Sequence, residues 1–434
     1  MTRKMKDSGI EWIGDIPEDW EISKFKRYSE SAMGNTILKT DLEENNNKET
    51  IPVYSATQED VVFGYIDENN VTVILKKNNL VIPARGNSIG FTKLVPYAKA
   101  TCTQTTIFSR LNNINEKFVY YCSIAFKDSW FEFDQTAIPQ ITVQQVENNN
   151  IPICSMEEQC KITNFLSNKL DNVKNIKFTI TKQIQTLEDY KKSVITEAVT
   201  KGLDKNVEMK DSGIEWIGEI PKHWKVIRIK NAAILKARIG WQGLKSDEFL
   251  DDSNLPYLVT GTDFKDGLVD WDSCVRISEK RFEMDKNIQI KENDLLITKD
   301  GTIGKLAIAK NCPDKASLNS GVFVMRNQGP YKYVDKYLYY LLQSEQFYLW
   351  FELNDAGNST IRHLYQRDFY NFSFTYPEIN EQNQIVDYLD KKTKLIDDSI
   401  AIKQKQLETL EEYKKSLIYE YVTGKKEVKD GEES

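Results

Sequence analysis

The chain has 434 residues, and this length predicts two or three domains. Hydrophobic residues make up 40% and aromatic residues 11%, which excludes a wholly disordered protein. The 65 acidic and 58 basic residues give a net charge of −7, which argues neither for nor against nucleic-acid binding. No apolar run is long enough to span a membrane and no apolar leader follows Met1, so we expect a cytoplasmic protein without membrane contact.

A 16-residue motif opens the chain and returns in its middle. MKDSGIEWIGDIPEDW at 5–20 and MKDSGIEWIGEIPKHW at 209–224 are identical at 13 of 16 positions, which indicates two related modules. We call these segments the two clasps. A peptide-binding or catalytic role is the less favoured alternative to a structural frame built by four tryptophans. These are Trp12, Trp20, Trp216 and Trp224.

The stretch after each clasp has the pattern of mixed α/β structure, although the two stretches are much less alike than the clasps. Two aromatic runs, 118–126 and 337–342, predict core helices rather than platforms for stacking bases. Four short apolar runs bounded by turn residues predict strands, at Val71–Leu75, Leu80–Pro83, Leu295–Thr298 and Val322–Met325.

A polar turn framed by glycines follows one predicted strand in each module. Glycine lets a backbone approach a ligand closely, and polar side chains beside it can bond base edges or phosphates. An ordinary hairpin loop is the equally weighted alternative. The candidates for DNA contact are Arg85, Asn87 and Ser88 in the first turn and Lys299 and Thr302 in the second.

A second pair of segments, Thr136–Ile141 and Thr360–Leu364, precedes the closing region of each half. Gln140, Arg362 and His363 are the candidates for DNA contact there, because their side chains can bond bases or phosphates. A structural strand edge is an equally weighted alternative.

Each half closes with a long segment that contains no proline. The ends of the two segments repeat each other, as LEDYKKSVITEAVT at 187–200 and LEEYKKSLIYEYVT at 410–423. The apolar period of seven predicts two coiled-coil helices over 155–200 and 378–423, each the other's packing partner. Gly202 and Gly424 are fitting helix stops. One seam comprises Val173, Ile180, Leu187 and Val194, with Ile176, Ile184 and Ala198 near the second; the other copy has Leu389, Ile396, Leu410 and Leu417.

Both closing segments carry the same tyrosine–lysine–lysine sequence. A solvated face is the favoured interpretation, and a contact with phosphate or with another subunit is the alternative. The residues are Tyr190, Lys191 and Lys192 in one copy and Tyr413, Lys414 and Lys415 in the other.

Motifs for catalysis are missing from the sequence. It holds no P-loop, no amino-methyltransferase motif and no clustered nuclease carboxylates, and two histidines argue against a histidine metal site. The chain therefore has the pattern of a binder rather than an enzyme. The alternative to DNA recognition is a protein-interaction scaffold that binds no DNA and oligomerises through its coiled coils.

The repeated clasps, variable modules and closing helices with Glu-Gln-x-x-Ile-x-x-x-Leu and Tyr-Lys-Lys-Ser resemble the specificity subunit of type I restriction–modification enzymes over essentially the whole chain. The resemblance implies an α+β fold with a pseudo-two-fold internal repeat, in which two mixed α/β target recognition domains are separated by two long antiparallel coiled-coil helices. From the repeats in this sequence we expect the domains at 1–153 and 204–377 and the spacer helices at 154–203 and 378–424. The charged run at 425–434 predicts a disordered tail.

The resemblance also implies partners. A subunit of this family binds double-stranded DNA at a bipartite asymmetric site without catalysing a reaction itself. It docks two modification subunits, which use S-adenosylmethionine to methylate adenine, and restriction subunits, which use ATP and Mg²⁺. We therefore expect no cofactor on this chain, and the tryptophans and helix faces named above become candidates for the frame and for subunit docking.

Overall fold

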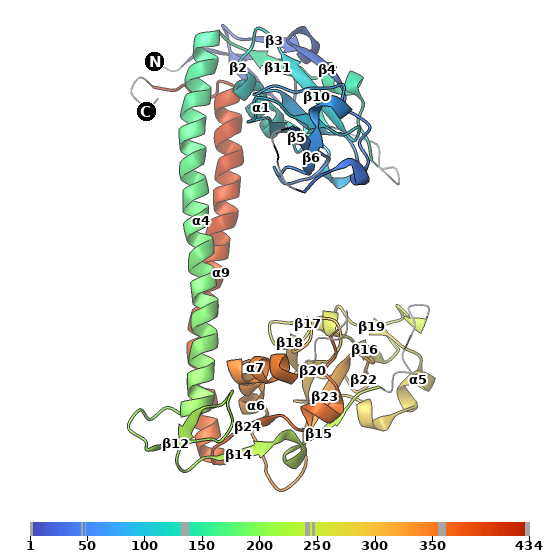
Figure 1. The fold of residues 1–434 in the computed structure, drawn as a ribbon, viewed down its shortest axis with the longest axis vertical. Coiled ribbons are helices and arrows are strands. Elements are labelled where there is room, and N and C mark those ends of the chain that lie inside the picture. Colours follow the sequence, from blue (N-terminus) through green and yellow to red (C-terminus); the bar gives the residue numbers. More distant parts are fainter. Residues whose placement is uncertain are drawn as a thin grey trace. The chain divides into compact units, whose positions relative to one another are not determined.

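The structure is a computed structural model that describes residues 3–44, 47, 49–131, 139–238, 244, 248–354 and 362–429. The chain divides into two compact units, one formed by Met1–Thr181 with Gln404–Ser434 and the other by Lys182–Lys403. Each unit contains a clasp, a β-rich body and part of each long helix, as the labels of Figure 1 show.

The first unit contains its clasp and two larger sheets. In the clasp, β1 (Met5–Asp7) and β2 (Asp15–Pro17) pair antiparallel. The main sheet has the order β4 (Ser29–Met33), β10 (Thr106–Leu111), β7 (Leu80–Pro83) and β8 (Lys93–Leu94). The second sheet has the order β6 (Gly64–Asp67), β5 (Thr50–Tyr54) and β9 (Thr101–Cys102). The other elements are β3 (Glu21–Lys24), its partner β11 (Asn150–Ile153), α1 (Glu116–Ala125), α2 (Lys127–Trp130) and α3 (Val143–Glu147).

The second unit repeats this plan with different residues. Its clasp pairs β12 (Met209–Asp211) with β13 (Glu219–Pro221). Its main sheet runs β15 (Ala233–Lys236), β23 (Val322–Asn327), β20 (Leu295–Thr298), β21 (Leu306–Ile308), β18 (Leu268–Val269) and β17 (Phe264–Lys265). The smaller sheet runs β19 (Val275–Arg276), β16 (Tyr257–Val259) and β22 (Ala316–Leu318). The rest comprises β14 (Lys225–Arg228), its partner β24 (Ser373–Tyr376), α5 (Glu279–Glu283), α6 (Asp335–Leu341), α7 (Glu345–Asn354) and α8 (Gln366–Phe369).

The equivalence of the two bodies extends to strand direction. In the smaller sheets the central strand makes one parallel pair, β5 with β9 in the first unit and β16 with β22 in the second. In the main sheets, β7 and β20 pair antiparallel with both of their neighbours. Two stretches with little sequence similarity therefore share one topology, and their main difference is the pair of additional strands β17 and β18.

The long helices α4 (Met156–Lys201) and α9 (Ile379–Val422) pack against each other within each unit. In the first unit Lys177 pairs with Glu411, and in the second Lys191 Nζ lies 2.7 Å from Asp397 Oδ1, so the helices run antiparallel. The α+β expectation is confirmed. Most of the predicted seam is buried, namely Val173, Ile180, Val194, Leu389, Ile396 and Leu417.

Two local predictions are wrong. Ile176 is 48% exposed, so it does not belong to a seam of the paired helices. Val71–Leu75 forms no strand, and only Leu75 makes an isolated bridge, to Ala100. The cause is the side chain of Asn35, whose Oδ1 accepts from the amides of Thr72 and Val73 and whose Nδ2 donates to the Val73 carbonyl. A side chain thus takes the backbone bonds that a neighbouring strand would need.

Candidate nucleic-acid interface

In the first unit, Arg85 and Gln140 form one isolated antiparallel bridge beyond the end of β7. The Gly86 amide donates to the Pro139 carbonyl at 2.9 Å, and the Ile141 amide donates to the Ala84 carbonyl at 3.0 Å. Arg85 and Gln140 are exposed, whereas Ala84 and Ile141 are buried. The structure therefore brings the predicted turn and the predicted second segment together and presents one polar side chain from each. Thr136–Ile138 lie outside the described residues.

The other two candidates of the first turn have different environments. Asn87 is exposed, and its carbonyl accepts from Gln58 Nε2 at 3.0 Å. Ser88 is buried, and its hydroxyl donates to the Ala56 carbonyl at 2.9 Å. The Ser88 hydroxyl thus links the turn to the segment after β5 by a hydrogen bond. Because Ser88 is buried, it is not part of the candidate interface.

The second unit places Asp300 and His363 in the equivalent isolated bridge, beyond the end of β20. The Leu364 amide donates to the Lys299 carbonyl at 2.9 Å. The Asp300 carboxylate lies between two of these neighbours, with Oδ1 2.6 Å from His363 Nδ1 and Oδ2 2.9 Å from Lys299 Nζ. Asp300 was not among the candidates, although it holds two of them. Thr360 and Ile361 lie outside the described residues.

The pKa of Asp300 reflects these contacts. Its partial burial would raise the pKa, but the hydrogen bonds from His363 and Lys299 and their positive charge outweigh burial and lower it. Asp300 is therefore a carboxylate over the whole neutral range, and its negative charge faces the imidazole of His363.

The remaining candidates of the second unit differ in their partners. The Arg362 guanidinium makes two hydrogen bonds to the Glu352 carboxylate, at 2.9 and 2.7 Å, and lies 5.3 Å from the centre of the Phe351 ring. Thr302 is exposed on the turn. The Arg362 side chain thus contacts two residues of α7, whereas the His363 ring is part-exposed.

The glycines of the two turns have a structural reason that the sequence did not reveal. A Cβ on Gly90, whose φ is +76°, would lie 2.4 Å from Phe131, and a Cβ on Gly304, with φ of +80°, would lie 3.1 Å from Phe347. The absence of a side chain at these two glycines leaves room for the rings of Phe131, at the end of α2, and Phe347, in α7. Gly86 and Gly301 have nothing within 4 Å of the added atom, so the turns are open where Arg85 and Asp300 stand.

The clasp tryptophans form part of the frame. Trp20 and Trp224 are fully buried, and Trp20 Nε1 donates to Glu158 Oε2 at 3.0 Å near the start of α4. Trp12 is part-buried, with its ring centre 4.8 Å from that of Phe126, and Trp216 packs partly buried against the core of the second unit. The burial of Trp20 and Trp224 favours the frame role over docking for this pair.

The two tyrosine–lysine–lysine segments of the long helices contain both exposed and part-buried side chains. Tyr190 is 51% and Tyr413 48% exposed, and Lys192 and Lys415 are exposed as well. Lys191 pairs with Asp397, as described above, so it contributes to the helix pair itself. Lys414 lines a cavity of about 330 Å³ beside α1, with Tyr120 and Tyr121 among the lining residues.

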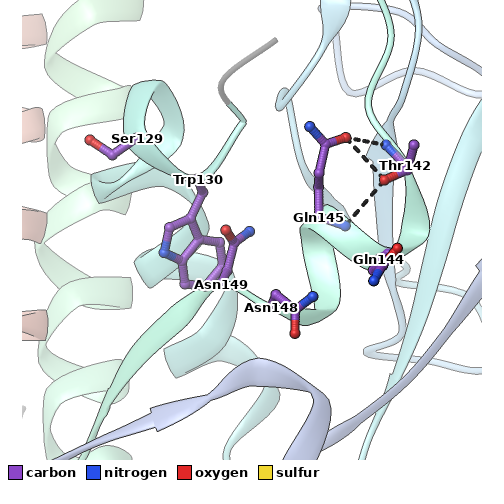
Figure 2. A pocket seen from close by; sticks show the side chains of 7 residues that line it. All are labelled: Ser129, Trp130, Thr142, Gln144, Gln145, Asn148 and Asn149. Atoms are coloured by element: carbon purple, nitrogen blue, oxygen red, sulfur yellow. Dashed lines mark hydrogen bonds between the residues drawn. The ribbon is translucent and has the colours of Figure 1, made fainter.

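A polar hollow of about 390 Å³ in the first unit was not anticipated. Figure 2 shows Gln145 turned back toward Thr142, whose amide donates to Gln145 Oε1 at 2.7 Å. This reciprocal cap starts α3 and matches the Thr-x-x-Gln signature of a helix N-terminus, which the sequence does contain. The lining residues are Ser129, Trp130, Thr142, Gln144, Gln145, Asn148 and Asn149.

The described residues also bear on metal binding and on membrane insertion. Among them, no group of three or more His, Cys, Asp or Glu side chains is arranged to hold a metal ion. No helix within the described part of the chain is long and apolar enough to cross a membrane.

Comparison with known proteins places the chain in a family. The pattern of the type I restriction modification DNA specificity domain matches residues 17–186 and 221–412. The MjaVIII specificity subunit of Methanocaldococcus jannaschii is 25% identical over 430 residues, covering 96% of this chain and 95% of that protein. The EcoBI specificity subunit of Escherichia coli is 22% identical over 282 residues, 63% of this chain and 57% of that protein.

A solved structure from a study of complex assembly in the type I restriction–modification system has the same fold. It has a TM-score of 0.68 at 14% identity, covering 94% of this chain and 98% of that one. The two matched segments of the family pattern together span most of the sequence. The chain therefore belongs to the type I restriction–modification DNA specificity family and is a non-catalytic specificity subunit.

Proposed function

We propose that this subunit reads a bipartite, asymmetric site in double-stranded DNA, with one half-site read by each unit. The observation that carries the proposal is the equivalent bridge, which presents Arg85 and Gln140 in the first unit and Asp300 and His363 in the second. One frame offers two different sets of polar side chains, so each unit is suited to a different base sequence. The target recognition domains in this proposal are 1–153 and 204–377. Family membership displaces the alternative of a scaffold without a DNA role.

The chemistry of the first bridge suggests what its half-site contains. Arginine bonds guanine O6 and N7 in the major groove, and glutamine bonds adenine N6 and N7. Arg85 and Gln140 project from neighbouring positions of one bridge, so they would contact neighbouring bases. The proposed first half-site therefore includes a guanine and an adenine close together. Asn87 is a further exposed donor and acceptor on the same turn.

The partner proposal rests on the exposed surface of the long helices. Phe178 on α4 is 71% exposed, and Leu395 and Ile402 on α9 are 64% and 62% exposed. Tyr190 and Tyr413 are exposed as well. Membership of the specificity family, together with these exposed apolar side chains, supports a contact with other subunits. We assign these faces to two modification subunits, with restriction subunits completing the complex. S-adenosylmethionine, ATP and Mg²⁺ would be bound by those partners, and the complex would work in the cytoplasm, where the DNA is.

The test is methylation mapping of the complex. The subunit is expressed with its modification subunits in a host that lacks DNA methylation, and the DNA is sequenced by a method that detects N6-methyladenine. We expect one bipartite motif with a methylated adenine in each half. A soluble complex that methylates no site, or a motif without two separated halves, would contradict the proposal. Omitting the specificity subunit provides the control for methylation by the modification subunit alone.

A further inference from the structure

The bridge of the second unit contains a connected set of three titratable groups. Lys299 and His363 both bond the carboxylate of Asp300, one at each oxygen, at 2.9 and 2.6 Å. The side chains of Asp300 and His363 are 33% and 37% exposed, so the set lies at the surface rather than in the core. The equivalent bridge of the first unit has no acid or histidine, because its two members are Arg85 and Gln140.

The contact with Asp300 determines which nitrogen of His363 is free to act. A carboxylate only accepts hydrogen bonds, so Nδ1 must carry the proton that it shares with Asp300 Oδ1. Nε2 has no partner among the described residues. It is an acceptor when the ring is neutral and a donor when the ring is protonated.

The charged surroundings of His363 in the described part of the chain are few. Asp300 and Lys299 face it from the turn after β20, and Tyr365 on its own segment has a ring centre 5.8 Å away. Its neighbour Arg362 is paired with Glu352 of α7. The Asp300 carboxylate lies between Lys299 and His363 and bonds both.

We propose that Asp300 is a positioning residue that holds His363 as a hydrogen-bond donor, through Nε2, toward an acceptor atom of one base in the second half-site. The inference rests on the proposed function. The acceptor class comprises guanine O6 and N7, adenine N7 and thymine O4 in the major groove. A phosphate oxygen shares this chemistry, but it would give no base preference, and the test separates the two.

The experiment measures how well the complex with modification subunits discriminates among bases, at pH 6 to 8.5. The substrates are DNA duplexes that contain the motif found by methylation mapping, and variants of it that change one base of the second half-site at a time. We expect discrimination at one position to fall about tenfold as pH rises, because a neutral imidazole that keeps its proton on Nδ1 has no donor at Nε2. Discrimination in the first half-site is the internal reference and stays constant, since its bridge has no group that titrates in this range.

Three variants identify the groups. Asp300→Asn is expected to remove the pH dependence and to lower discrimination at the same position, and His363→Gln to change the preferred base there. Asp272→Asn removes one negative charge from an exposed site in the same unit and is the matched control. Thermal unfolding of each variant shows whether the second unit is intact, and the wild-type pH series needs no variant at all.

The outcomes separate the two proposals. A bipartite motif whose second half shows no pH-dependent position in the wild-type complex overturns this inference and leaves the proposed function standing. A uniform loss of affinity over all sequences in Asp300→Asn, with a smaller salt dependence, identifies a phosphate contact and also overturns it. Absence of any bipartite motif overturns the proposed function itself.

Discussion

Gln159 and Gln382 stand 223 positions apart and make the same two hydrogen bonds, each within its own unit. Gln159 Oε1 accepts from the Asn115 amide and Gln382 Oε1 from the Val334 amide, both at 2.9 Å. Their Nε2 atoms donate to the carbonyls of Cys154 and Pro377, at 2.9 and 3.0 Å. Both side chains are buried. Each glutamine thus joins the start of a core helix, α1 or α6, to the residue two positions before the first residue of α4 or α9.

Replacing either glutamine by alanine should destabilise its own unit. The change leaves a buried amide and a buried carbonyl without a partner, which costs about 2 kcal/mol. Hydrogen exchange of the main-sheet amides in each unit measures the effect locally. The exposed Gln404 on α9 provides the matched control, and Gln404→Ala should change exchange little. Equal protection in Gln382→Ala and Gln404→Ala would refute this role.

The two buried clasp tryptophans should respond differently to phenylalanine. Both changes remove the same volume, but Trp20 Nε1 donates to Glu158, whereas Trp224 Nε1 has no partner among the described residues. In the second clasp His223 takes that place, with Nε2 3.0 Å from Glu381 Oε2. Trp20→Phe should therefore cost about 1 kcal/mol more than Trp224→Phe in urea unfolding. A larger loss in Trp224→Phe would contradict this account.

The long helices and some strands were predictable because their signals are local. The expected segments 155–200 and 378–423 differ from α4 and α9 by one residue at each end. A seven-residue apolar period without proline needs no tertiary information. Leu80–Pro83 and Leu295–Thr298 are found as predicted, since short apolar runs between turn residues favour buried strands.

The bridge residues could be predicted only as separate candidates. Asp300 and His363 are 63 positions apart, and the register of the sheet and its flanking segments, not a motif, brings them together. The failed strand at Val71–Leu75 has the same kind of cause, because the distant Asn35 side chain determines those backbone bonds. Tertiary contacts of this kind leave no periodic trace in the sequence.

The stability of the second unit should depend on pH through Asp300. Its pKa is lower folded than in the unfolded chain, where it is about 3.9. The group therefore adds stability above the unfolded pKa, and this contribution is lost as pH falls through the folded value. The stability difference between wild type and Asp300→Asn should shrink as pH falls below about 4. A difference that grows on acidification would show the opposite sign of shift.

Arg85 should control one base of the first half-site. Arg85→Ala removes the guanidinium but leaves the bridge backbone, so the loss is confined to recognition. A good bidentate contact to guanine is worth about 1–3 kcal/mol of discrimination. Methylation mapping should show one relaxed position in the first half and an unchanged second half. Arg85→Lys tests geometry, because lysine keeps the charge without the planar pair of donors.

The length of the long helices should set the gap between the two half-sites. α4 and α9 each continue from one unit into the other, so both are lengthened by four residues, after Thr181 and after Lys403. Four helical residues add about 6 Å, and base pairs are about 3.4 Å apart, so the gap should grow by one or two base pairs. Both half-sites should keep their sequences, because the bridges are untouched. Alanine replacement of four exposed residues at the same places, without a change of length, should leave the gap as it was. A methylated motif with an unchanged gap in the lengthened subunit would show that something other than these helices fixes the spacing.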